Sequence, residues 1–145
     1  MAFRFPLATV LRFRQSIEKR EELALQRVLV EIAQYIRKIE KLSARIAEAH
    51  QMREETLRQP TSAFQLQSML SEIQIAAERR RLLIDSLASL EQKRIKQMAA
   101  YQAALQDRRT LSELEGRRRE DYKVERERAQ QKQVDDIFAA RAHRS

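Results

Sequence analysis

The chain has 145 residues, 34% of them charged, with one glycine, two prolines, no tryptophan and no cysteine. This length predicts a single domain, residues 1–145. Enrichment in Ala, Glu, Lys, Leu, Arg and Gln is typical of long helices and coiled coils and argues against an ordinary globule. A net charge of +8 suits nucleic acid, an acidic protein or an anionic membrane face. However, the 29 basic and 21 acidic residues are mostly interleaved, as on a solvated helix with ion pairs.

The chain shows no sign of a membrane span or of secretion. No apolar run approaches the roughly 18 residues that a membrane-spanning helix needs, and there is no signal-peptide pattern. The absence of cysteine agrees with a reducing compartment. We therefore expect a cytosolic protein.

The first 14 residues combine dense apolar side chains with three arginines. Pro6 suits the first turn of a helix. The apolar residues are Phe3, Phe5, Leu7, Val10, Leu11 and Phe13. Two interpretations remain open: a helix start that packs its aromatic rings on a second helix, or a basic amphipathic surface for another protein or a membrane.

A first long helix is predicted over about residues 7–58. From Leu25 onward its apolar residues recur with the alternating three- and four-residue spacing of a coiled-coil seam. The seam residues are Leu25, Val28, Ile32, Tyr35, Ile39, Leu42, Ile46 and Ala49. Leu29 and Ile36 widen this apolar stripe beyond a two-helix seam. Either a broader interface within the fold or a docking face for a partner helix would explain them.

Residues 59–62 are predicted to form the corner between this helix and a second one, at about residues 63–140. Pro60 cannot continue a helix and pushes Gln59 out of the α region. Ser62, followed three residues later by Gln65, is a capping-box start. Such a short connection makes the two helices antiparallel.

Folding at this corner sets opposite each other residues whose numbers add to about 122. The apolar pairs include Ala49 on Ile73, Ile46 on Ala76, Ile39 on Leu83 and Leu11 on Leu111. Leu42 opposite Arg80 and Val28 opposite Arg94 are exceptions, in which a long arginine can lay its stem on the seam. The path Leu90-Arg94-Met98 contains two four-residue steps, which predicts a local stutter.

The same count predicts that pairing ends near Gly116. Beyond it the sequence is almost wholly charged, and roughly 25 helical residues would project about 37 Å. Val134, Ile137 and Phe138 lie in this overhang with nothing to bury against. The predicted fold is therefore all-α: two long antiparallel helices forming a coiled-coil hairpin with a C-terminal helical overhang.

No constellation of residues indicates catalysis. A phosphate- or dinucleotide-binding loop needs at least two glycines, whereas this chain has only Gly116. Zinc sites use clusters of Cys and His, whereas His50 and His143 stand far apart in sequence. We expect a non-enzyme with no catalytic, cofactor-binding or metal-binding residue and no small-molecule substrate.

Three basic runs, residues 79–81, 93–96 and 117–119, could contact phosphates. Successive residues on a helix point about 100° apart, so a run does not form one patch. No aromatic platform for stacking bases interleaves with these runs. Nucleic-acid binding is therefore the less favoured alternative.

Two blocks near the ends of the chain carry a more specific signal. The N-terminal block is Phe3-Arg4-Phe5-Pro6-Leu7-Ala8-Thr9-Val10-Leu11-Arg12-Phe13-Arg14. The distal block is Arg118, Tyr122, Glu125, then Gln131-Lys132-Gln133-Val134-Asp135-Asp136-Ile137, with Arg141 beyond. Together they resemble the flagellar FliJ family, and the resemblance extends over nearly the whole chain.

This resemblance implies a cytoplasmic component of the bacterial flagellar type III export apparatus, at the cytoplasmic face of the inner membrane. Family members are antiparallel two-helix coiled coils similar to the central stalk of rotary ATP synthases. They insert in and stimulate the hexameric export ATPase, and link it to the membrane export gate and to export chaperones. We expect these partners, no cofactor, and a monomer when the protein is alone.

The predicted hairpin brings the N-terminal aromatics and the overhang to one end, which by the resemblance enters the ATPase. The residues expected at that end are Phe3, Phe5, Leu7, Leu11, Arg117, Arg118, Arg119, Tyr122, Glu125, Asp135 and Asp136. The opposite end is expected to face the gate or a chaperone. Its expected contact residues are Phe64, Leu66, Met69 and Leu70.

Two other function classes remain open. One is a cytoplasmic scaffold that self-associates through Leu29, Ile36 and the seam. The other is a basic coiled coil for nucleic acid, whose affinity would fall steeply with salt.

Overall fold

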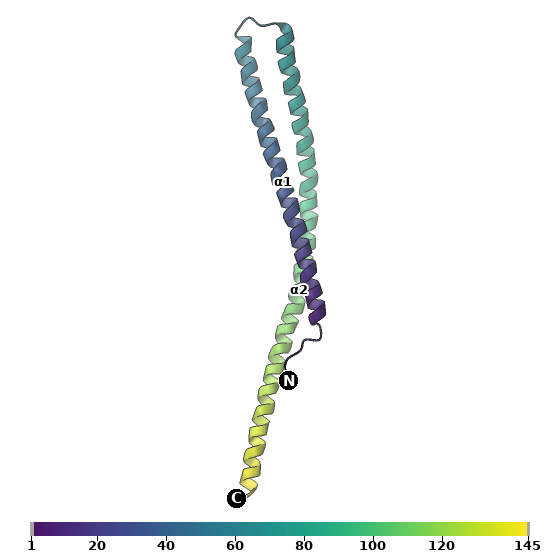
Figure 1. Cartoon of the computed structure of the whole chain (residues 1–145), viewed down its shortest axis with the longest axis vertical. Coiled ribbons are helices and arrows are strands. Elements are labelled where there is room, and N and C mark those ends of the chain that lie inside the picture. The colour runs from purple at the N-terminus through teal and green to yellow at the C-terminus, as the bar shows by residue number, and fades with distance from the viewer. Residues whose placement is uncertain (1, 145) are drawn as a thin grey trace. The chain divides into compact units, whose positions relative to one another are not determined.

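The computed structural model describes residues 2–144, which form two α-helices and no strand. Helix α1 runs over Ala8–Leu57 and helix α2 over Ala63–Arg144 (Figure 1). The prediction of an all-α fold with two long helices is therefore confirmed. Helix α2 continues about four residues beyond its predicted end. Met1 and Ser145, the ends of the predicted single domain, lie outside the described residues.

Contacts divide the chain into two compact units, each built from a stretch of both helices. The corner unit comprises residues 22–100, and the terminal unit comprises residues 2–21 with 101–144. Within the described part of the chain, neither helix has a stretch apolar enough to cross a bilayer.

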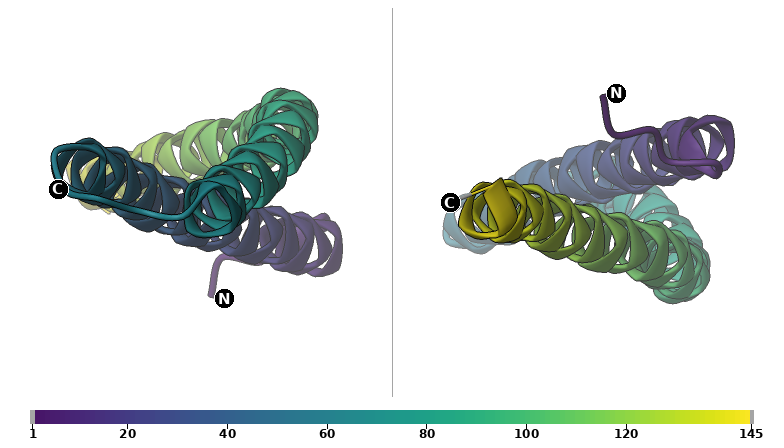
Figure 2. Two further views of the ribbon diagram at one scale, coloured as in Figure 1. Left: turned by 90° about the horizontal axis from the view of Figure 1, so that it is seen from above. Right: turned by 90° about the horizontal axis from the view of Figure 1, so that it is seen from below.

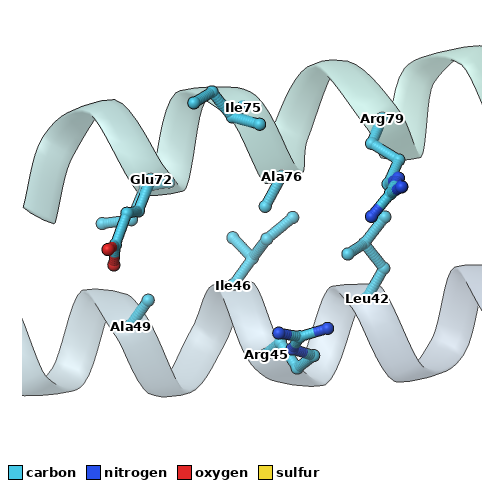
Figure 3. Close-up of a pocket in the computed structure, with 9 residues that line it drawn as sticks. Leu42, Arg45, Ile46, Ala49, Glu72, Ile75, Ala76 and Arg79 are labelled. Carbon is cyan, nitrogen blue, oxygen red and sulfur yellow. The ribbon is translucent and has the colours of Figure 1, made fainter.

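The core of the corner unit is the predicted heptad seam. Its buried residues are Leu25, Val28, Ile32, Leu42 and Ile73. In Figure 3, Ile46 points toward Ala76, as the predicted register requires. Arg79 and Arg80 are both exposed, but Arg79, and not the predicted Arg80, lines the same groove as Leu42. The arginine stem on this part of the seam is therefore displaced by one residue from the prediction.

Hydrogen bonds close the corner between α1 and α2. Figure 2, left, draws the connection between the two helices as a thin teal segment. The Gln65 amide donates to Ser62 Oγ at 3.1 Å, which confirms Ser62 as the N-cap of α2. The Thr61 hydroxyl lies 2.8 Å from the carbonyl oxygen of Thr56 and 2.9 Å from that of Gln59. Its single proton can serve either carbonyl, so Thr61 adds a hydrogen bond at the end of α1, where the Gln59 amide also donates to the Thr56 carbonyl at 3.1 Å.

In the terminal unit the buried side chains are Leu11 and Ala104. Leu11 lies two heptads before Leu25, so the frame of the seam extends back through Glu18. On α2, Ala104 is buried while Leu105 is only partly so, and Arg108 is partly buried four residues later. The predicted stutter lies elsewhere on α2, at Leu90, Arg94 and Met98, which are all partly buried.

One arginine of each basic run forms an ion pair with a carboxylate on α2. Arg81 lies 2.6 Å from Glu78 and 3.2 Å from Asp85. Arg94 pairs with Glu91 at 2.9 Å, and Arg119 lies 3.4 Å from Glu115. This arrangement is that of a solvated helix with ion pairs, and it weakens the case for phosphate binding by these runs.

Candidate functional site

The terminal unit contains a contact between the chain before α1 and the side of α2. The Phe3 ring lies 5.6 Å from the Tyr122 ring at 50°, and the Arg119 guanidinium lies 5.2 Å from the centre of the Phe3 ring. We call these three residues the N-terminal clamp. Aromatic pairs and cation–π contacts of this kind contribute about 0.5–1.5 and 0.5–1 kcal/mol, respectively. The clamp therefore holds the chain before α1 against the side of α2.

The geometry of residues 2–7 explains how the clamp forms. The Ala8 amide donates to the Phe5 carbonyl at 3.1 Å, so Pro6 and Leu7 lie in a turn ahead of the helix, and Pro6 is not in its first turn. The prediction that α2 loses its intramolecular partner at Gly116 is therefore wrong. Gly116 lies within continuous helix, and contacts with the N-terminal segment reach Tyr122.

A shallow pocket of about 480 Å³ lies beside the clamp. Its walls are Ala2, Phe3, Arg4, Pro6, Arg118, Asp121, Tyr122 and Glu125. Two arginines and two carboxylates line it, so it offers donors and acceptors without a dominant charge. Of the residues predicted for the ATPase end, the structure thus brings together Phe3, Arg118, Arg119, Tyr122 and Glu125.

The other residues predicted for this end lie elsewhere in the terminal unit. Leu11 is buried in the seam and has a packing role, while Leu7 is exposed and Phe5 is half-buried. Arg117 is exposed on α2. Asp135 accepts a hydrogen bond from Gln131 Nε2 at 3.1 Å, and Asp136 beside it is exposed. Asp135 and Asp136 are thus away from the clamp.

Beyond Glu125, residues 126–144 form a stretch of α2 that is exposed on all sides, and we call it the distal helix. Val134, Ile137 and Phe138 lie on one face of it because residues three and four apart are neighbours on a helix. Phe138 is 66% exposed. The predicted overhang therefore exists, but it begins about ten residues later than expected.

The corner unit exposes apolar side chains near the connection between α1 and α2. Phe64, the second residue of α2, is 83% exposed. Leu57 and Met52 on α1 are also exposed, whereas Leu66, Met69 and Leu70 are half-buried. Phe64 is thus the most accessible of the four residues predicted for the gate end, and the other three also pack locally.

A groove of about 380 Å³ runs between α1 and α2 within the corner unit (Figure 3). The groove is open because Ala49 and Ala76 have small side chains, and the charged residues Arg45, Glu72 and Arg79 line it.

No metal-binding group of three His, Cys, Asp or Glu occurs among residues 2–144. His50 and His143 are both exposed.

An ion pair between the helices joins Glu18 on α1 to Arg108 on α2. Arg108 Nε lies 2.7 Å and its terminal nitrogen 3.2 Å from the two carboxylate oxygens of Glu18, and both side chains are largely covered. These hydrogen bonds lower the pKa of Glu18, and the positive charges of Arg108 and Arg109 add to the effect. Nearby, Arg14 lies 3.3 Å from Asp107.

Sequence analysis did not single out Glu18 and Arg108, although a signal for them was present. Counting back seven residues from Leu25 places Glu18 on the seam, and the antiparallel count places it near Ala104 and Arg108. A carboxylate and an arginine at opposed seam positions indicate a cross-helix ion pair.

Compared with known families, the chain matches the family described as "Flagellar FliJ protein" over residues 3–145. The chain matches no curated protein and no solved structure.

Proposed function

Since the chain belongs to the flagellar FliJ family and is thus a component of the flagellar export apparatus, we propose that it acts as the central stalk of the export ATPase. In this role it is not an enzyme. It inserts in the hexameric ATPase, stimulates ATP hydrolysis and links the ATPase to the membrane export gate and to export chaperones. Its place is the cytoplasmic face of the inner membrane.

The observation that carries the proposal is the distal helix. A helix of 19 residues exposed on all sides, without a covering segment among the residues described, is the kind of element that a ring can surround. Isolated helices of this length are marginal in water, so contact with a partner would stabilise it. The clamp anchors the base of the distal helix, because Phe3 lies against both Arg119 and Tyr122 just before it begins.

The corner unit supports a second contact, with the gate or a chaperone. Phe64 and Leu57 expose apolar surface on either side of the connection between the helices. Aromatic side chains are enriched at protein interfaces. The two sets of exposed apolar residues lie in different units of the chain, which allows two partners to be bound by separate residues.

The test is ATP hydrolysis by the purified hexameric export ATPase with and without this protein. A variant that ends at Glu125 removes the distal helix and leaves the clamp, the seam and the Glu18–Arg108 pair in place. We expect it to lose most of the stimulation. The matched comparison is Phe64→Ala, which changes only an exposed side chain and should stimulate as the full chain does while binding the gate less tightly.

Circular dichroism on both variants must first show that the paired helices remain folded. Equal loss of stimulation in the two folded variants would contradict the division of function between the two units. Full stimulation by the chain that ends at Glu125 would contradict the stalk role itself. If the full-length protein sediments as an oligomer and does not stimulate the ATPase, the function of a self-associating scaffold is favoured over the stalk role.

A further inference from the structure

We propose that the N-terminal clamp controls whether α2 stays helical past Gly116. While Phe3 is seated on α2, the helix continues through this glycine into the distal helix. When Phe3 is released, α2 opens at Gly116 and the helical hydrogen bonds of residues 117–125 break more often. The clamp is thus a conformational device within the terminal unit, and this role holds whether or not the distal helix enters the ATPase.

Gly116 is a point of low intrinsic helix stability in α2. A glycine in the interior of a helix lowers helix formation about fivefold relative to alanine. Neither the backbone nor the packing requires a glycine here, because its φ is not positive and a Cβ at this position would meet nothing within 4 Å. The glycine therefore lowers the stability of the helix without making a close contact that would offset this loss.

The residues of α2 directly after Gly116 pack against little. Residues 116–121 are all exposed, and Tyr122 is the first residue beyond the glycine that is half-buried. One ion pair spans the glycine, since Arg119 lies 3.4 Å from Glu115, but pairs of this kind on a helix surface contribute little. Helical order beyond Gly116 therefore depends on what covers Tyr122.

The chain at the start of the protein supplies this cover and is fixed to α2 on both sides of Gly116. Beyond the glycine, the rings of Phe3 and Tyr122 lie 5.6 Å apart. Before the glycine, Arg14 of α1 lies 3.3 Å from Asp107 of α2. A segment that is attached on both sides of a weak point opposes the opening of the helix between its two attachments.

The contacts of Phe3 are of the same size as the cost of the glycine. An aromatic pair such as Phe3 with Tyr122 shifts an equilibrium by about two- to twelvefold. The cation–π contact between Arg119 and Phe3 adds about two- to fivefold. The approximately fivefold cost of Gly116 lies within this range, so the loss of Phe3 removes the contribution that offsets it.

Release of Phe3 does not require α1 to unfold. Residues 2–7 precede the helix, and the Leu11 amide already donates to the Leu7 carbonyl at 2.9 Å, which closes the first turn of α1 without Phe3. Phe3 is half-buried, and the shallow pocket of about 480 Å³ lies beside it. The clamp can therefore open while the seam stays paired.

The test is amide hydrogen exchange of the full-length protein, without the ATPase, measured over residues 117–125. Phe3→Ala removes the ring that covers Tyr122 and should speed this exchange by about fivefold or more, while residues 25–42 remain unchanged. Phe64→Ala makes the same substitution at an exposed phenylalanine of the corner unit. It should leave the exchange of both segments within about twofold of the unmodified protein.

A second substitution tests whether the helix opens at the glycine. Gly116→Ala should slow the exchange of residues 117–125 by about fivefold. Combined with Phe3→Ala, it should return this exchange to within about threefold of the unmodified protein. The added methyl group enters open space, so both variants should remain folded, and circular dichroism checks this.

Three results would overturn the proposal. Phe3→Ala could leave the exchange of residues 117–125 unchanged, it could speed the exchange of residues 25–42 equally, or Gly116→Ala could fail to slow exchange in the combined variant. Because the measurement contains no ATPase, the clamp can fail this test while the stalk role stands. Conversely, a protein that does not stimulate the ATPase can still show the full exchange pattern.

Discussion

Glu18 of α1 and Arg108 of α2, ninety residues apart in the chain, are joined by two hydrogen bonds of 2.7 and 3.2 Å across the seam. Glu18 occupies the seam position midway between the buried Leu11 and Leu25. A charged pair at such a position contributes little net stability but can fix the register of a coiled coil, because a shift would leave both charges uncompensated. The pair thus anchors the alignment of the two helices in the terminal unit.

Replacing Glu18 should alter the response of the protein to acid. Because hydrogen bonding to Arg108 lowers the pKa of Glu18 in the folded state, its contribution to stability is full above the ordinary glutamate pKa. That contribution is lost as the pH falls through the lowered pKa of the folded protein. Glu18→Gln should therefore have a lower Tm than the unmodified protein at pH 7, and the difference should shrink at pH 3.

Thermal unfolding followed by circular dichroism at several pH values measures this effect. Glu31→Gln changes an exposed carboxylate on the same helix and serves as the control. If Glu18→Gln and Glu31→Gln follow the same pH dependence, the ion pair does not act across the seam as described.

Two leucines one helical turn apart should differ sharply in their importance for stability. Leu25 is 7% exposed on the seam, and Leu29 is 44% exposed beside it. Leu25→Ala should lower the free energy of unfolding by about 2–4 kcal/mol, since it leaves a cavity. Leu29→Ala should change it by no more than about 0.5 kcal/mol.

Urea unfolding of the two variants gives both values, and the substitution is chemically the same in each. A large loss for Leu29→Ala that grows with protein concentration would show that a second copy covers Leu29. That result would favour the self-associating scaffold.

Amide hydrogen exchange should separate the distal helix from the paired helices. Residues 126–144 are exposed on all sides, and the backbone hydrogen bonds of a helix without a packed face open readily. Residues 25–42 lie along the buried seam and should exchange many times more slowly. If both segments are equally protected from exchange in a dilute sample, a further contact must cover the distal helix.

The pairing of the helices could be predicted because it depends on periodicity. Leu25, Val28 and Ile32 are buried at the spacing that a two-helix seam requires, and Ser62 caps α2 as its position three residues before Gln65 indicates. These features follow from local sequence and from one antiparallel count. Arg108 and Ala104 were missed because the count followed large apolar side chains, whereas the seam also accepts a small residue and a charged pair.

Helical patterns could predict only part of the clamp, since the antiparallel count sets Phe3 opposite Arg119 but not opposite Tyr122. Residues 2–7 are not helical, and a non-helical chain covers up to about 3.3 Å per residue whereas a helix rises only 1.5 Å. Six such residues can therefore run alongside about 13 residues of α2. Contact between Phe3 and Tyr122 is within this reach, although the helix-to-helix count stops near Leu114.

The central claim is that the distal helix enters the export ATPase, and site-specific photo-crosslinking tests it most directly. A photoreactive phenylalanine analogue replaces Phe138 in one sample and Phe64 in a second, since both side chains are exposed phenylalanines in different units. Each protein is mixed with the assembled hexamer and irradiated. The account predicts a crosslink to the ATPase from position 138 and none from position 64. A crosslink to the ATPase from position 64 with none from position 138 would contradict it.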